Sequence, residues 1–386
     1  MRLFRKIYIF LFLVVILVLP SCNRIEKEAY IIDTRLRFNI EDVFDSGLSE
    51  DWHIDRYYLS NPYENPDLDY YISSSCQTNG YIYYISSGYK PMSTVCGACE
   101  VLKKDINTGD ITKVYSYNEE DNRQIPVMKY TEDNLFWIVE DGDNWDLVRY
   151  DLKLGEYRIL ESSNTYKTKV IPNIEASDGY LFWYIINTNN KIKFFEYSIQ
   201  DDKIEEIKEK SHYLYSYFDT VKCTPGFMTY LTREKGEIVI NLRDLTSNEL
   251  YSLNTNSDQI SYAIGNKNYI VWIEEGANST LCVYDISTKT LKSINCSNNI
   301  IRSVAINDMD ILIDFSRIYM EEEGEVSREN SGIFQFDFAN EVLSPVYLSD
   351  RDETIAWLDE FSGKFSINSW KNKGQELMNG RIVLTN

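Results

Sequence analysis

The chain has 386 residues, of which 44% are hydrophobic, and its formal net charge at pH 7 is −21. This length is enough to bury a sizeable core. The strong negative charge repels phosphate backbones and anionic headgroups, which excludes nucleic acid as a partner. With 8 prolines and 17 glycines, the sequence also lacks the composition of a disordered linker.

The first residues have the pattern of an export signal. Arg2, Arg5 and Lys6 form a short basic region, and an uninterrupted apolar run follows at residues 7–19. As a helix this run would reach about 20 Å, which is short of the roughly 30 Å hydrocarbon core of a membrane. The pattern predicts a secretory signal peptide at residues 1–21 rather than a spanning helix.

The end of the signal resembles the lipobox of bacterial lipoproteins, with Leu19, Ser21 and Cys22, although Pro20 departs from the residues usual there. The resemblance implies cleavage before Cys22 and diacylation of its sulfur. Two acyl chains give stable anchoring, so the protein is expected to be lipid-anchored outside the cytoplasm, at the cell surface or in the periplasm. The alternatives are an uncleaved anchor or a simple signal peptide. Without the three basic residues of the signal, the net charge is 36 − 60 = −24.

Residues 22–69 are expected to hold the lipidated N-terminus and a tether. Within them, residues 29–40 alternate enough to form a strand that could pair with the last repeat and close a ring. Residues 60–69, with two prolines and several acidic residues, predict a tether or a surface loop.

An internal repeat dominates residues 70–386. A short apolar-aromatic strand recurs seven times, and the steps between its marker residues are 53, 46, 47, 42, 41 and 44. The markers are Tyr84, Trp137, Trp183, Tyr230, Trp272, Ile313 and Trp357. A period of 40 to 50 residues is typical of arrays such as β-propellers.

A second strand follows each of the first six repeats and ends in a turn-forming residue. Tyr150-Asp151 and Tyr284-Asp285 are examples, followed by hairpin residues such as those at 107–110 and 153–156. Gly, Asn and Asp tolerate the positive φ that tight hairpins need. A further short strand completes each unit. About four short strands per unit predict an all-β, seven-bladed propeller of four-stranded antiparallel blades over residues 70–386.

This rhythm resembles exported bacterial propellers of the TolB-like and low-density-lipoprotein-receptor-like kind. The resemblance implies a binding or assembly role by analogy only. The recognition motifs of those families are not matched, since there is no Tyr-Trp-Thr-Asp tetrad. On the fold alone, the recurring tyrosines and tryptophans are expected to pack between blades.

Catalytic signatures are missing from the sequence. It has two histidines, His53 and His212, and no Gly-x-Ser-x-Gly elbow, so neither a serine nor a cysteine relay is indicated. A histidine-rich metal centre is excluded by count. No catalytic residue, metal or cofactor is therefore predicted. The acidic stretch 140–146 lacks the full spacing of a calcium loop and favours a hairpin turn.

Six cysteines follow Cys22, which permits disulfides but leaves their pairing open. The compact motif Cys96-Gly97-Ala98-Cys99 indicates a local disulfide or free thiols, with a redox or metal role as the alternative. Cys282 and Cys296 lie on consecutive predicted strands and are either close together or separately buried.

Loop length gives one hypothesis for a ligand site. Two loops between second and third strands are expected to be long, at residues 86–100 and 314–332, and only blade seven separates them. Long loops on a rigid scaffold concentrate function. The ligand contacts proposed for this sector are Tyr89, Met92, Cys96, Cys99, Trp145, Tyr319 and Met320.

The sequence therefore predicts a membrane-anchored, monomeric binding or scaffold protein whose ligand is a protein, peptide or glycan. The alternative is a carbohydrate-active enzyme that uses paired carboxylates at the channel mouth. A sensor domain for a small ligand is a third possibility.

Overall fold

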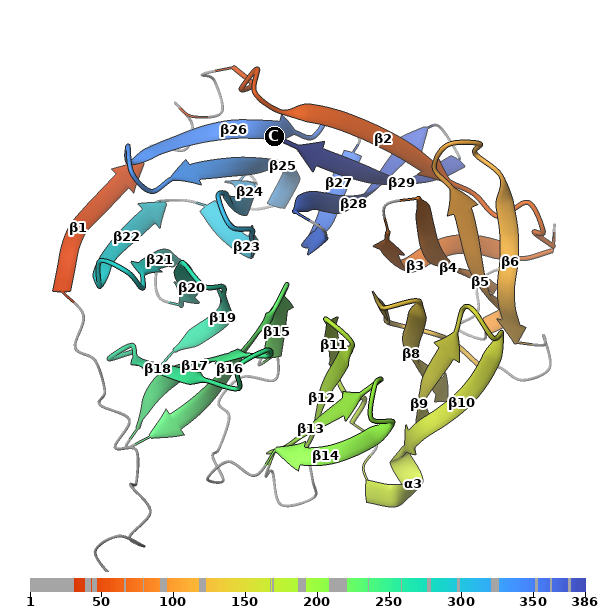
Figure 1. The fold of residues 1–386 in the computed structure, drawn as a ribbon. Helices are drawn as coiled ribbons and strands as arrows, with labels where there is room; N and C mark the ends of the chain where they lie inside the picture. Colours follow the sequence, from red (N-terminus) through yellow and green to blue (C-terminus); the bar gives the residue numbers. More distant parts are fainter. Residues whose placement is uncertain are drawn as a thin grey trace, which may run out of the picture.

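The computed structural model forms a ring of seven sheets (Figure 1). It describes residues 31–386 apart from 39–42, 44–46, 66, 79, 91–95, 118–122, 167, 169, 187–191, 208–220, 235, 258, 276–278, 297–298, 321–325, 351–352, 362 and 374–375. The prediction of a seven-bladed propeller with four-stranded antiparallel blades is confirmed.

Each blade runs outward from the channel in chain order, and the strand bounds for the first three blades are as follows. Blade one holds β3 (Asp69–Gln77), β4 (Tyr81–Tyr89), β5 (Cys96–Asp105) and β6 (Ile111–Tyr117). Blade two holds β7 (Met128–Thr131), β8 (Asn134–Asp141), β9 (Asn144–Asp151) and β10 (Glu156–Ser162). Blade three holds β11 (Ile174–Ser177), β12 (Tyr180–Ile186), β13 (Ile192–Ser198) and β14 (Lys203–Ile207).

The next three blades repeat this order. Blade four holds β15 (Val221–Thr224), β16 (Phe227–Glu234), β17 (Glu237–Asp244) and β18 (Leu250–Asn254). Blade five holds β19 (Ile260–Gly265), β20 (Tyr269–Glu274), β21 (Thr280–Asp285) and β22 (Thr290–Cys296). Blade six holds β23 (Asn299–Ile306), β24 (Ile311–Met320), β25 (Val326–Asp337) and β26 (Val342–Leu348).

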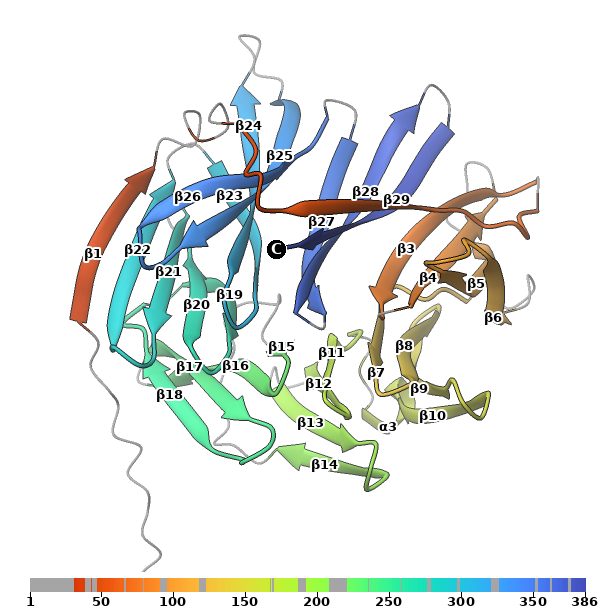
Figure 2. The same ribbon diagram turned by 45° about the horizontal axis from the view of Figure 1, so that its top comes forward.

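Blade seven is built from both ends of the chain. Its inner strands are β27 (Glu353–Phe361), β28 (Lys364–Lys373) and β29 (Glu376–Thr385), and its outer strand is β2 (His53–Leu59). The pairing of β2 with β29 is antiparallel and runs from His53 opposite Thr385 to Leu59 opposite Asn379. The last blade is thus completed by a strand that precedes the first blade (Figure 2).

The ring-closing strand is not the one expected from the sequence. The strand predicted at residues 29–40 corresponds to β1 (Ile31–Phe38), which pairs parallel to β22 as a fifth strand of blade five. The strand β2 was not foreseen because its segment mixes charged and aromatic residues, with a burial pattern that is largely exposed or intermediate. Residues 60–68 form no strand, as expected for a surface loop.

The observed repeat differs from the predicted one in the last blade and at the two loops that were expected to be long. Six markers lie on the second strands of their blades, but Trp357 lies on the innermost strand, β27; the equivalent buried position in β28 is Ile367. The expected long loops are long hairpins, since β4 and β5 stay paired out to Tyr89 and Cys96, and β24 and β25 out to Met320 and Val326. Small polar residues in these extensions, among them the buried Ser86, interrupt the apolar pattern but not the ladder.

Aspartates at the ends of third strands fix the outer hairpins. In blade four, Asp244 Oδ1 accepts the backbone N–H groups of Thr246 at 2.7 Å and Ser247 at 2.9 Å, and these bonds hold the pKa of Asp244 below its usual value. Four residues after the start of each turn, the backbone has positive φ, as at Asn248 (61°). The equivalents in the other blades are Gly109, Gly155, Asp202, Lys289 and Glu341. The predicted hairpin chemistry is confirmed.

Apolar clusters hold neighbouring blades together. The buried residues of the described chain form seven clusters, and each one spans a different pair of adjacent blades. Trp137 lies in the cluster between blades one and two, and Trp183 in that between blades two and three, each 0% exposed. The expectation that the recurring aromatic residues pack between blades is therefore confirmed for these positions.

The cluster at the closure, between blades seven and one, has only four buried members. Leu59 of β2 packs there against Ile82, Tyr84 and Leu102. Polar contacts add to it: the Tyr84 hydroxyl donates to the carbonyl of Ser60 at 2.6 Å. Trp52, just before β2, is 7% exposed and packs in the cluster between blades six and seven.

Among the described residues, helix is nearly absent. The four-residue helix α3 (Ser163–Tyr166) follows β10, and Val43 is also helical. Among the described residues, no helix has the length and apolar character needed to cross a membrane.

Two truncations separate the roles of β1 and β2. Deletion of residues 1–39 removes only an edge strand of blade five and should leave the thermal midpoint nearly unchanged. Deletion of residues 1–59 also removes Trp52 and Leu59, whose burial is worth about 1.5–3 kcal/mol each, and opens blade seven. We expect this variant to unfold at a much lower temperature in circular dichroism melts. Equal midpoints for the two truncations would contradict the closing role of β2.

Candidate functional site

The predicted ligand contacts whose side chains the structure describes are partly or fully buried. Tyr89 is partly buried, stacks on Tyr71 with ring centroids 4.7 Å apart and donates its hydroxyl to Gln124 at 2.9 Å. Trp145 is 1% exposed inside the cluster between blades two and three. Met92 lies outside the described residues, and Tyr319 and Met320 end β24.

The cysteine motif belongs to a strand rather than to a loop. Cys96 and Cys99 lie in β5, and a register shift opposite Gly88 and Tyr89 leaves Gly97 unpaired between them. One extra residue changes the parity of a strand, so both thiols pack in the same cluster and are 3% and 1% exposed. No disulfide joins the cysteines whose side chains the structure describes, and Cys282 lies opposite Ser293 rather than Cys296.

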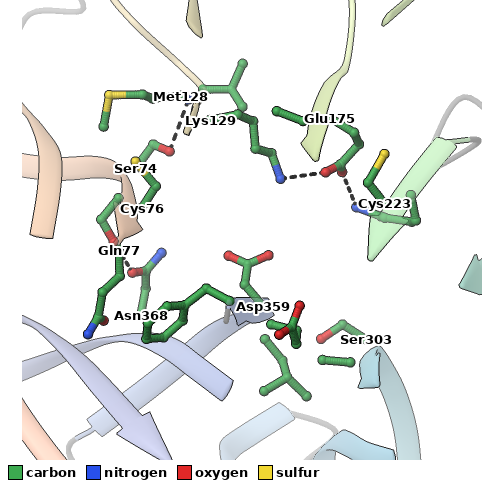
Figure 3. Close-up of a pocket in the computed structure, with 18 of the residues that line it drawn as sticks. Ser74, Cys76, Gln77, Met128, Lys129, Glu175, Cys223, Ser303, Asp359 and Asn368 are labelled. Carbon is green, nitrogen blue, oxygen red and sulfur yellow. Dashed lines mark hydrogen bonds and ion pairs between the residues drawn. The ribbon is translucent and has the colours of Figure 1, made fainter. Parts of the chain in front are cut away.

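The central channel contains the one large cavity that the innermost strands of all seven blades share in the described chain. Its volume is about 540 Å³, within the range usual for small-ligand sites. The walls come from β3, β7, β11, β15, β19, β23 and β27, with further side chains from β24, β28 and β29 (Figure 3). The sequence predicted a ligand site on the loops at residues 86–100 and 314–332, away from this cavity.

Three charged residues on consecutive blades form a chain across one side of this cavity. Glu175 of blade three accepts hydrogen bonds from both lysines, with Lys129 Nζ 2.8 Å from Oε2 and Lys222 Nζ 2.9 Å from Oε1 (Figure 3). The side chains of Lys129, Glu175 and Lys222 are 24%, 9% and 19% exposed. Burial opposes charge on Glu175 and on Lys129, but the attraction between opposite charges outweighs it, because the pKa of Glu175 is lowered and that of Lys129 is raised.

Strand alternation explains why these charges face the channel. On a strand, neighbouring side chains point to opposite faces. The residues just before the three charged ones are Met128, Ile174 and Val221, which are 1%, 0% and 3% exposed and pack between blades. With the preceding residue fixed in the core, each charged side chain is directed into the channel.

Two arginines also contribute to the channel walls. Arg302 of β23 binds Asp314 of β24, with Nη2 2.7 Å from Oδ1, and Asp314 is 1% exposed. Arg381 of β29 is 2% exposed, and its Nη1 donates to the carbonyl oxygen of Ser75 at 2.9 Å and to the Ser75 hydroxyl at 2.7 Å. This guanidinium joins blade seven to blade one, and burial lowers its pKa.

On the opposite side, β27 presents two carboxyl groups. Asp359 points into the cavity (Figure 3) and has no hydrogen bond or ion pair to any described residue, although its charge raises the pKa of Lys129. Glu360 accepts the Gly363 N–H at 2.6 Å. Burial, reinforced by the charges of Asp178, Asp308 and Asp359, raises the pKa of Glu360 to about 7.

Several uncharged groups complete the walls. The hydroxyl of Ser303 and Oε1 of Gln77 are buried and have no hydrogen-bond partner among the described residues. Cys76 also lines the cavity, where burial raises the pKa of its thiol to about 12. A thiol with this pKa stays protonated at neutral pH and is a poor nucleophile.

The two histidines take no part in this cavity as far as it is described. His53 lies on β2 at the outside, where its ring nitrogen is 3.1 Å from Asp55. His212 lies outside the described residues.

The sequence contains a signal for the three charged residues of the cavity, which loop length does not reveal. Lys129, Glu175 and Lys222 are separated by 175 − 129 = 46 and 222 − 175 = 47 residues. The markers Trp137, Trp183 and Tyr230 have the same steps. Charged residues that recur at the period of the repeat, each after an apolar residue, occupy one equivalent position in successive blades.

Comparison with known proteins supports the fold. The sequence matches no protein-family model, and no curated protein matches it. The β-propeller domain of the Trilobed protease from Pyrococcus furiosus has a TM-score of 0.57 and 10% identity, over 81% of this chain and 93% of that one. An acylaminoacyl peptidase has a TM-score of 0.54 and 12% identity, over 80% and 52%. Oligopeptidase B from Leishmania major has a TM-score of 0.52 and 10% identity, over 81% and 48%.

The chain therefore spans nearly all of one propeller domain but only about half the length of the two peptidases. At these identities the likeness shows the fold alone, a propeller. TolB from Acinetobacter baumannii also matches, with a TM-score of 0.39 and 8% identity, which is too low to carry an argument.

Replacement of Glu175 tests whether the charged chain is held by its carboxylate. Glu175→Gln leaves two ammonium groups close together without a counter-charge. Breaking a buried pair in this way costs roughly 3–5 kcal/mol, and the partial exposure of both lysines places the expected loss at or below the lower end. Lys371→Gln, which removes an exposed pair with Asp350, should cost less than about 1 kcal/mol. Equal losses in urea unfolding would contradict this account.

Replacement of Glu360 tests the raised pKa. A carboxyl group with a usual pKa of 4.5 and a folded pKa of about 7 stabilises the fold below pH 4.5, and this contribution is lost as the pH rises through about 7. Glu360→Gln removes that dependence, so its free energy of unfolding should fall less between pH 5 and 8 than that of the wild type, by on the order of 2 kcal/mol. Parallel profiles from chemical denaturation would show that Glu360 titrates normally.

Proposed function

We propose that the chain is an exported, lipid-anchored binding protein that takes its ligand into the central channel. The observation that carries the proposal is the channel cavity of about 540 Å³, whose walls hold charged and unpartnered polar groups from several blades. Unpartnered polar groups in a buried site are costly unless something binds them. A ligand that supplies the missing partners would offset this cost.

Export and anchoring rest on the sequence at residues 1–22, which lies outside the described residues. If Cys22 carries the lipid, residues 23–30 separate it from β1. Eight extended residues span at most about 29 Å. Because β1 pairs with the outer strand of blade five, this link would keep the rim of that blade close to the membrane surface.

The alternative, a carbohydrate-active enzyme, has less support from the channel. Glycoside cleavage uses two carboxyl groups on opposite sides of the scissile bond. Glu175 is engaged by two lysines and Asp314 by Arg302. The other two carboxyl groups, Asp359 and Glu360, are adjacent on one strand. The raised pKa of Glu360 would suit a general acid, but the carboxylate across the cavity, Glu175, is held in ion pairs with two lysines.

A variant that fills the channel tests the proposal. Ser303→Trp places a large ring in the cavity and removes a hydroxyl that has no hydrogen-bond partner in the described chain. With delipidated protein as bait in an envelope extract, we expect ligand capture to fall at least tenfold for this variant. Lys203→Trp, on the exposed outer strand of blade three, is the matched control and should capture as the wild type does. Undiminished capture by a folded Ser303→Trp protein would rule out the channel as the site.

A further inference from the structure

We propose that the channel ligand is an amino-carboxylate, meaning a molecule with both a free carboxylate and a free ammonium group, as in a free amino acid or a short peptide. This inference rests on the proposed function and specifies the chemistry of the same site. It places the ligand carboxylate at Lys129 and Lys222 and the ligand ammonium at Asp359.

The carboxylate half of the proposal follows from the two lysines. Each ammonium group has three N–H donors. Lys129 donates one of them to Oε2 of Glu175, and Lys222 donates one to Oε1. The three side chains together carry one net positive charge. A second carboxylate beside Glu175 would neutralise this charge and accept hydrogen bonds in the geometry that carboxylates and ammonium groups prefer.

The ammonium half follows from Asp359. Its carboxylate projects into the cavity and lacks a hydrogen-bond or ion-pair partner among the described residues (Figure 3). The neighbouring Glu360 has a raised pKa, which shows that this side of the cavity disfavours further negative charge. A ligand ammonium would give Asp359 the partner it lacks and relieve that repulsion.

The presence of both signs in one cavity excludes simpler ligands. A purely anionic ligand at the lysines would lie in the same cavity as the Asp359 carboxylate, whose charge raises the pKa of Lys129. A purely cationic ligand at Asp359 would meet the field of Lys129 and of Arg381. Like charges placed near each other in a binding site disfavour binding. A ligand with opposite charges at its two ends satisfies both sides at once.

The remaining walls fit a ligand of this kind. The unpartnered hydroxyl of Ser303 supplies a donor from blade six. The partly buried Ala176 contributes apolar surface to the same cavity. The cavity is more polar than the usual small-molecule site, in which a few polar groups fix orientation within apolar walls.

Calorimetric titration of the wild-type protein with four probes tests the inference without any mutation. The probes are the tripeptide Ala-Ala-Ala, its N-acetylated form, its C-terminal amide, and free L-alanine. We expect the tripeptide or alanine to bind saturably at millimolar concentration. If the tripeptide binds, each capped peptide should bind at least tenfold more weakly than the uncapped one. A site built around a charged group rejects the analogue that lacks it, because its own charge is left unpaired. Binding of alanine alone identifies a free amino acid as the ligand, and binding of the tripeptide alone identifies a peptide.

Two variants then assign the ends of the ligand. Asp359→Asn should weaken binding of the uncapped probe at least tenfold and leave binding of the N-acetylated probe unchanged. Lys222→Gln should weaken binding of the uncapped probe at least tenfold and leave binding of the amidated probe unchanged. Lys371→Gln, outside the channel, is the control. The inference is overturned if neither uncapped probe binds, or if capping has no effect. If probes fail while Ser303→Trp still abolishes capture from the extract, only the ligand chemistry is wrong and the channel remains the site.

Discussion

The pairing of β2 with β29 is the constraint on which the rest of the structure depends. A blade of four strands cannot bury both of its faces by itself, so each sheet needs a neighbour on either side, and the last one needs the first. Chain connectivity joins six of the seven interfaces automatically. The seventh forms only when a segment more than three hundred residues away in sequence returns to the final sheet. Without this pairing, the ring is open between blades seven and one.

Among the described residues, the closing interface has the smallest apolar cluster, and polar contacts add to it. Four buried apolar residues form its cluster, against twelve between blades one and two. Arg381 spans the gap at the channel end by donating to Ser75 of blade one. A buried guanidinium is stable only while its acceptors are in place. Closure of the ring and integrity of the channel wall are therefore linked through the same side chain.

The parts of the fold that could be read from the sequence are those governed by local chemistry. Aromatic strands recur because each blade faces another, and aspartates such as Asp244 recur because the backbone N–H groups of the outer hairpin turns need an acceptor. The errors arose where long-range pairing decides. No local pattern distinguishes β1 from β2 as the closing strand, and the seventh marker, Trp357, fell on an inner strand because blade seven borrows its outer strand from elsewhere.

The candidate site was missed for a related reason. Arguments from loops assume that function lies where the chain is irregular, whereas here the charged residues lie on short regular strands. Lys129, Glu175 and Lys222 each occupy one position of such a strand, and no single copy is unusual. Their relation becomes visible only when three repeats are compared at the same period. Their ion pairs, and the absence of a partner for Asp359 among the described residues, depend on blades meeting around an axis, which no segment of sequence encodes alone.

This arrangement separates packing from channel charge within single strands. On β7, β11 and β15 the first of two adjacent residues packs between blades and the second faces the channel. Substitution at the second position changes the charge of the cavity without removing apolar surface from the clusters that hold the ring together. A propeller of this kind can therefore change the charge of its channel by exchanging one residue per blade, because the packing that fixes each strand is carried by the residue beside it. The limit on such exchange is electrostatic, since each buried charge in the channel requires a counter-charge.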